Sequence, residues 1–380
     1  MFIDALARQA DRVRIIRIVP EELRASWAER PQVLDALESE FWGHTVNVSL
    51  IARRRRGENF YNHYVQGIFS SSERPEFYAY GGVKIWSEVQ KHLEQPTSAV
   101  FLHRLQSAYA FPGHHPIGNT RIYFDLDDVE HRVLFRKIVQ PPFWIGKCAY
   151  GLHIPAIINA ERRTSRRSRA TLVCSAIDQK HLERLSFSNV AVVPNAVRTP
   201  PARQPLTSSP NILFLGLIEY APNREAVTRL AKSILPKIWQ QLPVTKLIIA
   251  GQGSETLEFD DSDGRIEKLG FVADLDALYA RARLVCCPLR NGGGTRIKLI
   301  EAAAYSKPVV TTTVGNEGLD FEDGSEVLVR DDDEDIARAC VDLLSDTRLC
   351  ERLAENAHRR MNSHYERSMI VNRIAGIVNG

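Results

Sequence analysis

The sequence lacks the features that mark several specialised classes of protein. Its 380 residues include six cysteines but no Cys-x-x-Cys pair, which argues against a zinc site and against a disulfide framework. No apolar run reaches the ~18–20 residues that a membrane span needs. The first helix-like stretch carries Asp4 and Arg8, so it does not have the composition of a signal peptide. These absences predict a soluble, cytoplasmic protein whose cysteines are buried thiols.

Composition and charge are those of an ordinary globular protein with a basic first half. Hydrophobic residues make up 44% of the chain and charged residues 25%, which excludes a disordered or fibrous protein. Residues 1–200 hold 27 Lys and Arg against 20 Asp and Glu, whereas the remainder hold 22 against 26. A basic surface attracts an anionic membrane or a phosphorylated acceptor, or it is simply a solvated face. Nucleic-acid binding is disfavoured because the arginine runs lack interleaved aromatics. The runs are residues 53–56 and Arg162, Arg163, Arg166, Arg167 and Arg169.

Apolar strand-like runs alternate with helical segments along the chain. In the second half the expected strands are 211–216, 246–251, 266–272, 282–288, 308–312 and 326–329, with helices from about 223 to 241, near 275–281, and from about 295 and 335. In the first half they are 13–19, 99–103, 121–125, 171–175 and 190–194. Such alternation predicts parallel sheets covered on both faces. At roughly 150 residues per domain the length fits two of them, joined by a linker at 195–210. Open sheets bind ligands at the carboxyl ends of their strands, so a cleft between two such domains is the expected site.

The strongest chemical signal is the glycine-rich segment from 288 to 310. A strand ends, Gly292, Gly293 and Gly294 let the backbone approach a ligand, and a helix begins. Free backbone amides at such a turn form an anion site, most naturally for a diphosphate. Lys298 lies in the first helical turn, and Glu301, three residues on, shares its side of the helix and suits the two hydroxyls of a ribose. The spacing is neither a Walker loop nor a Rossmann fingerprint. A tight turn with surface charges is the alternative.

Arg296 poses a geometric condition for this site. On an ideal helix it lies about 160–200° around the axis from Lys298. Both cations therefore reach one ligand only if the first turn of the helix is irregular.

These motifs resemble those of GT-B glycosyltransferases of family 4, the glycosyl transferases group 1. The resemblance covers about residues 99–375 and is strongest from 190 onward. In the second half it is carried by Phe214-Leu-Gly216 with Pro222-Asn223, by 249–253, by Gly270-Phe271-Val272, by the glycine loop with Glu301-Ala302, and by 314–319. In the first half it is carried by 126–130, 175–178 and 193–197.

The resemblance implies a fold and a set of roles. The fold is α/β, with two doubly wound Rossmann-like domains facing across a cleft: an acceptor-binding domain at 1–195, a nucleotide-sugar donor domain at 205–365, and a C-terminal helix at 366–380 that crosses back to the first domain. The backbone at Phe271 and Val272 would hold the base, and Glu301 the ribose. Gly216 would let the phosphates approach. The donor site as a whole is expected to comprise Gly216, Asn223, Phe271, Val272, Gly293, Gly294, Thr295, Arg296, Lys298 and Glu301.

The implied reaction is hexosyl transfer from a nucleotide-diphosphate sugar to a glycan or lipid-linked acceptor, as in polysaccharide biosynthesis. It would proceed with retention of configuration, with no metal and no cofactor beyond the co-substrate. The protein would be cytoplasmic, with peripheral contact with the inner face of the membrane as a further possibility. Three residues are expected near the chemistry, each with a bland alternative. His103 ends a strand and contacts the sugar or acceptor, or is structural. Asp127, with Asp128, binds acceptor hydroxyls or acts as a base, or caps the next helix. Glu317 meets the sugar hydroxyls, or is a turn charge.

Three departures from the family pattern keep other functions open. Many relatives carry a glutamate where this chain has Gly293, and Leu217 follows Gly216 where an Arg and a Lys are common. The start of the chain reads as the end of the first helix, so a first strand with its glycine-rich turn is expected to be missing. A non-catalytic nucleotide-sugar-binding protein and a nucleotide-sugar 2-epimerase of the same fold are the alternatives. Three weaker segments are expected to be a loop (His114-His115), core packing (141–145) and a helix cap (331–335).

Overall fold

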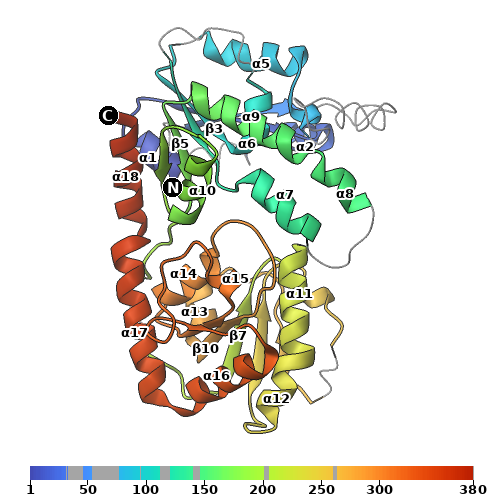
Figure 1. Ribbon diagram of the computed structural model, residues 1–380, viewed down its shortest axis with the longest axis vertical. Helices are drawn as coiled ribbons and strands as arrows, with labels where there is room; N and C mark the ends of the chain where they lie inside the picture. Colours follow the sequence, from blue (N-terminus) through green and yellow to red (C-terminus); the bar gives the residue numbers. More distant parts are fainter. Residues whose placement is uncertain are drawn as a thin grey trace. The chain divides into compact units, whose positions relative to one another are not determined.

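Figure 1 shows the computed structural model of the chain. It describes residues 1–30, 32, 46–53, 77–94, 96–111, 120–139, 146–200, 205–259 and 263–379. The expectations for 54–56, 114–115 and 141–145 fall outside these residues. The chain divides into two compact units, one made of residues 1–193 with 371–380 and the other of 194–370.

The second unit is built on a six-stranded parallel sheet in the order β12-β11-β10-β7-β8-β9. From β7 the chain adds β8 and β9 outward on one side, then returns to place β10, β11 and β12 on the other. The strand order therefore reverses between β7 and β10, which is where open α/β sheets bind ligands. This confirms the doubly wound α/β prediction. The strands are β7 (Asn211–Leu215), β8 (Lys246–Ala250), β9 (Ile266–Lys268), β10 (Leu284–Cys287), β11 (Val309–Thr311) and β12 (Leu328–Val329).

The helices of this unit pack on the sheet through apolar faces. Both α14 and α16 contact β10 and β11, and the residues of β10 and β11 are all buried. The helices are α11 (Ala221–Arg229), α12 (Leu235–Trp239), α13 (Leu275–Ala280), α14 (Ile297–Ala304), α15 (Thr313–Asn316), α16 (Asp333–Ser345) and α17 (Thr347–His364), with a short 3-10 turn at Ser254–Thr256.

Two local sequence signals shape these helices. The helix expected from about 223 to 241 forms as α11 and α12 joined by a π-helical turn, Leu230–Ile234. Pro236 has no N–H to offer the preceding turn, and a local change of helical pitch accommodates that loss. The acidic run at 331–335 caps α16 as predicted, since the Asp332 carboxylate accepts a hydrogen bond from the amide of Asp335.

The first unit holds a four-stranded parallel sheet, β3-β4-β5-β6, and a separate parallel pair, β1-β2. It too is α/β, as predicted. The strands are β1 (Val13–Val19), β2 (Val46–Ala52), β3 (Ala99–His103), β4 (Arg121–Asp125), β5 (Ala170–Val173) and β6 (Val190–Val192). The helices are α1 (Phe2–Ala7), α2 (Glu21–Ala28), α5 (Val83–Leu93), α6 (Arg104–Tyr109), α7 (Glu130–Val139), α8 (Gly146–Gly151), α9 (Ile154–Arg167) and α10 (Ala176–Arg184), with a 3-10 turn at Tyr78–Tyr80.

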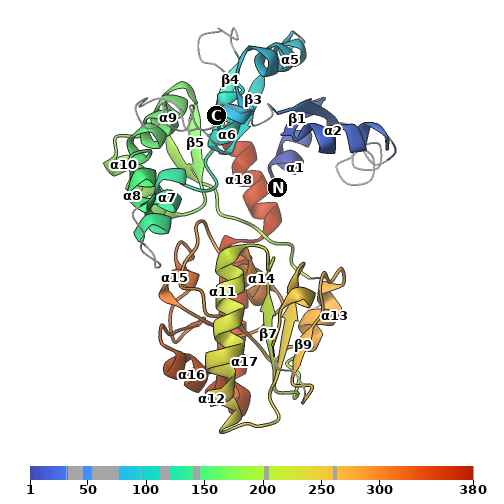
Figure 2. The ribbon, with the colours of Figure 1, turned by 90° about the vertical axis from the view of Figure 1, so that its right-hand side faces the viewer.

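The last helix of the chain, α18 (Arg367–Asn379), ends against β4. The carbonyl of Val378 accepts hydrogen bonds from the Arg121 guanidinium at 2.7 Å and from the Tyr123 hydroxyl at 3.0 Å. Residues 371–379 thereby belong to the first unit although they are last in sequence (Figure 2).

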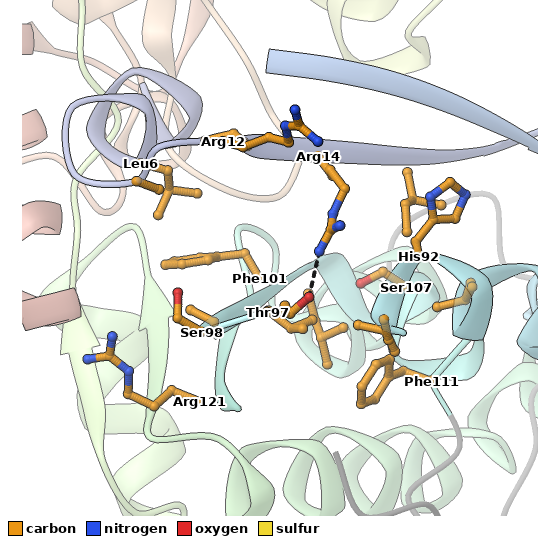
Figure 3. A pocket seen from close by; sticks show the side chains of 18 of the residues that line it. Leu6, Arg12, Arg14, His92, Thr97, Ser98, Phe101, Ser107, Phe111 and Arg121 are labelled. Carbon is orange, nitrogen blue, oxygen red and sulfur yellow. Dashed lines mark hydrogen bonds between the residues drawn. The ribbon is translucent and has the colours of Figure 1, made fainter. Parts of the chain in front are cut away.

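A cavity of about 310 Å³ lies between β1 and β3 (Figure 3). Arg14 of β1 donates a 2.6 Å hydrogen bond to the Thr97 hydroxyl just before β3. Among the strands that the structure describes, β1 pairs with β2 and β3 pairs with β4. The expectation that a first strand is missing stays a prediction.

Two features are absent from the residues that the structure describes. No helix among them is long and apolar enough to cross a bilayer. Nor do three or more of their His, Cys, Asp and Glu side chains gather in a way that could hold a metal ion. The cysteines described with their side chains, Cys174, Cys286, Cys287, Cys340 and Cys350, are buried free thiols.

Candidate functional site

The carboxyl ends of β7 and β10 carry the residues that the sequence singles out. Gly216 directly follows β7, and the glycine loop follows β10 and leads into α14. Gly292 and Gly294 adopt φ angles of +133° and +63°, a region that side chains avoid. The loop therefore depends on glycine at these two positions, and it lies at the point where the strand order reverses.

Lys298 is fixed at the end of β7 by a specific partner. Its Nζ donates a 2.7 Å hydrogen bond to Asn223 Oδ1 and lies 4.7 Å from the centre of the Phe214 ring. The amide group of Asn223 is itself oriented, because its Nδ2 donates to the carbonyl of Leu217 at 2.9 Å. Burial lowers the pKa of Lys298. The ammonium is thus held in place and desolvated, a state in which a bound anion gains most from it.

Gly216 makes room for this arrangement. A Cβ atom on Gly216 would lie 2.6 Å from Lys298 Nζ and 2.8 Å from Asn223 Nδ2. Any other residue would displace the lysine or the asparagine. The family resemblance explains this glycine by the approach of phosphates; the structure adds a reason within the protein itself.

Glu301 lies one turn along α14 and has a partner that the sequence analysis missed. The Tyr279 hydroxyl donates to Glu301 Oε2 at 3.2 Å. Tyr279 is fully buried and stacks on Tyr305 with ring centres 4.2 Å apart. Burial raises the pKa of Glu301, while the Tyr279 hydrogen bond and the charge of Lys298 act in the opposite direction. A tyrosine within the apolar pattern of α13 gave no signal beyond core packing.

Arg296 braces the loop from within. It is the N-cap of α14, outside the helix, with φ −90° and ψ 86°. Its guanidinium donates to the carbonyls of Gly293 at 2.6 Å and Val314 at 3.3 Å, and also to that of Gly294. The helix start is therefore irregular, which is the condition set for Arg296 to share a ligand with Lys298. Its donation to loop carbonyls shows a positioning role, and its expected contact with a ligand stays a prediction.

Two further contacts shape the surroundings of the loop. The Asn195 side chain donates to the Thr295 hydroxyl at 2.8 Å. Beyond β9, Gly270 is held in a left-handed conformation, φ +66°, by the amide of Gly251 and the hydroxyl of Ser254. This turn presents the Phe271 side chain, 77% exposed, with Val272 next to it.

In the first unit, His103 and Asp125 form a pair at the ends of adjacent strands. They are register partners of β3 and β4, and His103 Nδ1 lies 2.6 Å from Asp125 Oδ2. The histidine side chain is 66% exposed and the aspartate side chain 8%. The hydrogen bond to Asp125 raises the pKa of His103, whereas burial raises the pKa of Asp125. A buried carboxylate thus orients an exposed imidazole. Asp125 was not among the residues singled out from the sequence.

Asp127 is engaged by two other side chains. Arg104 donates to its Oδ2 at 2.8 Å, and the Cys174 thiol donates to its Oδ1 at 3.0 Å. Burial opposes ionisation here, but the hydrogen bonds from Cys174 and Arg104 keep the pKa of Asp127 below its ordinary value. Asp128 lies 3.4 Å from Arg104. Arg104 adopts φ +60°, a strained conformation for a non-glycine residue. Asp127 is therefore an ionised carboxylate fixed at the end of the β4 strand.

The expected site residues fall into two groups, one in each unit. The second unit brings together Gly216, Asn223, Lys298 and Glu301, with Gly293, Gly294, Thr295 and Arg296 in the adjoining loop. Glu317 follows α15 in the same unit. The first unit brings His103 close to Asp125, and Asp127 close to Arg104 and Cys174. Their roles toward a ligand stay predictions.

Comparison with known proteins bears on the second unit first. Residues 209–346 match the family described as Glycosyl transferases group 1. The chain carries a glycosyl transferases group 1 domain. A curated relative, the "Uncharacterized 44.6 kDa protein in cps region" of Klebsiella pneumoniae, is 22% identical over 173 residues. That alignment covers 43% of this chain and 45% of the relative, so the match spans less than half the length of either protein.

Solved structures show the fold of the whole chain. It aligns with WaaG, a glycosyltransferase involved in lipopolysaccharide biosynthesis, at a TM-score of 0.63 and 16% identity, covering 100% of this chain and 95% of the other. It aligns with Anabaena Alr3699/HepE, solved with UDP and glucose, at a TM-score of 0.65 and 14% identity, covering 100% and 94%. TarM aligns at a TM-score of 0.62 and 14% identity, covering 78% and 58%. The chain therefore has the GT-B fold, as predicted.

Proposed function

We propose that this chain transfers a sugar from a nucleotide-diphosphate sugar to a hydroxyl of a glycan or lipid-linked acceptor. The observation that carries the proposal is the position of Lys298. A desolvated ammonium is fixed by Asn223 beside a glycine loop, at the strand ends where the sheet order reverses. That geometry suits a diphosphate, and Glu301 follows on the same helix.

Each part of the donor has a counterpart in this site. Loop amides of Gly293, Gly294 and Thr295, with Lys298, hold the diphosphate. The Glu301 carboxylate, oriented by the Tyr279 hydroxyl, accepts hydrogen bonds from the ribose hydroxyls. The backbone at Phe271 and Val272 contacts the base. The sugar leaves the diphosphate as negative charge grows on the leaving phosphate, and fixed cations and amides stabilise that charge.

Stereochemistry, metal use and acceptor form the finer part of the proposal. We infer transfer with retention and without a metal, since the positive charge that the leaving group needs is available from Lys298 and the loop. The acceptor is a saccharide, and His103 and Asp127 of the first unit bind it. Asp125 orients the His103 imidazole. A role in polysaccharide biosynthesis is supported by the relative from a cps region and by the part that WaaG has in lipopolysaccharide biosynthesis. Contact with a membrane at the basic residues of α9 belongs to the same proposal.

The test is consumption of donor sugars. Purified chain is incubated with UDP-, GDP-, ADP- and dTDP-glucose, with and without EDTA, and nucleotide release is followed with oligosaccharide acceptors present. The proposal expects one donor to be used, EDTA to have no effect, and NMR of the product to show the donor's anomeric configuration. A donor that is bound but never consumed would instead support the non-catalytic alternative. Inversion of the donor sugar at C2 without an acceptor would support the epimerase.

A further inference from the structure

A polar pocket lies at the amino ends of the strands of the six-stranded sheet, at the end opposite to the glycine loop. Arg283 immediately precedes β10, Ser306 and Lys307 lie between α14 and β11, and Thr347 begins α17. All are at the amino ends of the strands, whereas the glycine loop is at the carboxyl ends. Arg283, Ser306 and Thr347 line a pocket of about 480 Å³ together with Leu206, Glu351 and Glu355.

Arg283 is a buried cation without a carboxylate partner in the part of the chain that the structure describes. The residue is 6% exposed. Its guanidinium donates to the carbonyl of Thr207 at 3.0 Å and to the Thr347 hydroxyl at 2.9 Å, both neutral groups. Its Nε finds no acceptor among the described residues. Burying a charge without a counter-charge is costly, so this guanidinium is poised to accept an anion.

A second buried cation lies behind the pocket wall. Lys307 is fully buried, and its Nζ donates to the carbonyl of Pro205 at 3.4 Å. Burial, together with the nearby charge of Arg283, lowers the pKa of Lys307 to about 8. The nearby Cys350 thiol supplies no counter-charge at neutral pH, because burial raises its pKa to about 11. A negative group in the pocket would stabilise both cations.

Ser306 adds a donor in an unusual conformation. It is 2% exposed, its φ is +53°, and its hydroxyl has no hydrogen-bond partner among the described residues. Buried hydroxyls normally have a partner. The inner end of the pocket therefore collects N–H and O–H donors, while the carboxylates of Glu351 and Glu355 are at exposed positions of α17.

We propose that this pocket binds a small tetrahedral oxyanion of the phosphate class, held by Arg283, Ser306 and Thr347, at a site separate from the glycine loop. Its inner donors match several oxygens of one anion. The exposed carboxylates of Glu351 and Glu355 repel large anions at the mouth of the pocket, so the site suits a small ion that fits between them and the inner donors. The inference does not depend on the sugar-transfer proposal. α14 connects the two sites, since it carries Lys298 and Glu301 and ends beside Ser306.

The experiment is a titration with inorganic phosphate at constant ionic strength, followed by thermal unfolding and by the line width of phosphate in ³¹P NMR. The variants are Ser306→Gly and Arg283→Met for the pocket and Lys298→Met for the glycine loop. Glycine accepts a φ of +53° more readily than serine, so Ser306→Gly keeps the fold even if Arg283→Met does not. Acetate and chloride serve as control anions.

The proposal expects saturable stabilisation by phosphate to persist in Lys298→Met, where the glycine loop has lost its cation. In that background Ser306→Gly should weaken phosphate binding about tenfold, by loss of a hydrogen bond to a charged group. Acetate should behave like chloride. The proposal is overturned if phosphate neither stabilises nor broadens. It is equally overturned if binding survives in Ser306→Gly but is lost in Lys298→Met, because the phosphate then occupies the glycine loop, or if acetate binds as well as phosphate.

Discussion

Lys298 and Asn223, 75 positions apart in sequence, meet through a 2.7 Å hydrogen bond at the end of β7. Among the described residues, Asn223 is the one side chain to which Lys298 donates a hydrogen bond. The carbonyl of Leu217 accepts a hydrogen bond from Asn223 Nδ2 and so fixes that side chain in turn. The position of the lysine is therefore set by the protein before any ligand arrives, which lowers the entropy cost of binding.

Replacing Asn223 should consequently weaken diphosphate binding. In Asn223→Ala the ammonium loses its acceptor and its fixed position, and affinity for a nucleoside diphosphate is expected to fall about tenfold. Affinity for the matching nucleoside should hardly change. Isothermal titration of both ligands measures the difference. Asn211→Ala, which removes an exposed side-chain hydrogen bond to the Arg281 carbonyl, is the control. An equal loss for nucleoside and diphosphate would mean that Asn223 supports the unit in general.

Gly216→Ala tests the space that the glycine provides. The new Cβ would lie 2.6 Å from Lys298 Nζ, so the lysine must move. We expect weaker diphosphate binding and a loss of about 1–3 kcal/mol in the free energy of unfolding. Gly376→Ala is the matched control, because a Cβ there meets nothing within 4 Å, and within α18 it should stabilise by about 0.5–1 kcal/mol. Denaturant unfolding measures the free energy of unfolding of both variants. An unchanged value for Gly216→Ala would contradict the close approach of Lys298 to this glycine.

Tyr279→Phe should change the pH dependence of nucleotide binding. The Tyr279 hydroxyl favours the ionised form of Glu301 and lowers its pKa, in opposition to burial. Removing it raises that pKa further. Because the carboxylate is the form that accepts ribose hydroxyls, binding should be lost at a higher pH than in the wild type as the solution is acidified. Dissociation constants measured from pH 5 to 8 locate the two midpoints; coincident midpoints would contradict the role given to Tyr279.

The pair in the first unit predicts a shift in a histidine titration. The hydrogen bond to Asp125 raises the pKa of His103 above its ordinary value. In Asp125→Asn the negative partner is gone, so the pKa of His103 should fall. The imidazole signals in NMR report it directly, with His103→Gln used to assign them. A pKa that stays the same in the variant would show that Asp125 does not control His103.

How far the sequence leads depends on where the partners lie in the chain. The glycine loop, Lys298 and Glu301 are neighbours in sequence, so helical spacing alone places them together. Tyr279 and Asp125 reach their partners, Glu301 and His103, across 22 positions of packing and strand register that no local pattern contains.

The side chain of Arg296 illustrates the same limit at a finer scale. The helix was expected from about residue 295 but begins at Ile297, which leaves Arg296 outside it and turned onto the loop carbonyls. A shift of two residues in the start of the helix is thus enough to change where the Arg296 side chain points. Residue spacing in the sequence does not predict helix boundaries to within two residues.

The most direct test of the account is titration of UDP, GDP, ADP and dTDP into the wild-type chain and into Lys298→Met, with Lys237→Met, an exposed lysine paired with Glu334, as the control. Ligand at 100 times its dissociation constant should also add about 2.7 kcal/mol to the free energy of unfolding. The account predicts that one diphosphate binds wild type and Lys237→Met alike and binds Lys298→Met at least about tenfold more weakly. Undiminished binding to Lys298→Met, or no binding by a wild-type chain that unfolds cooperatively, would contradict it.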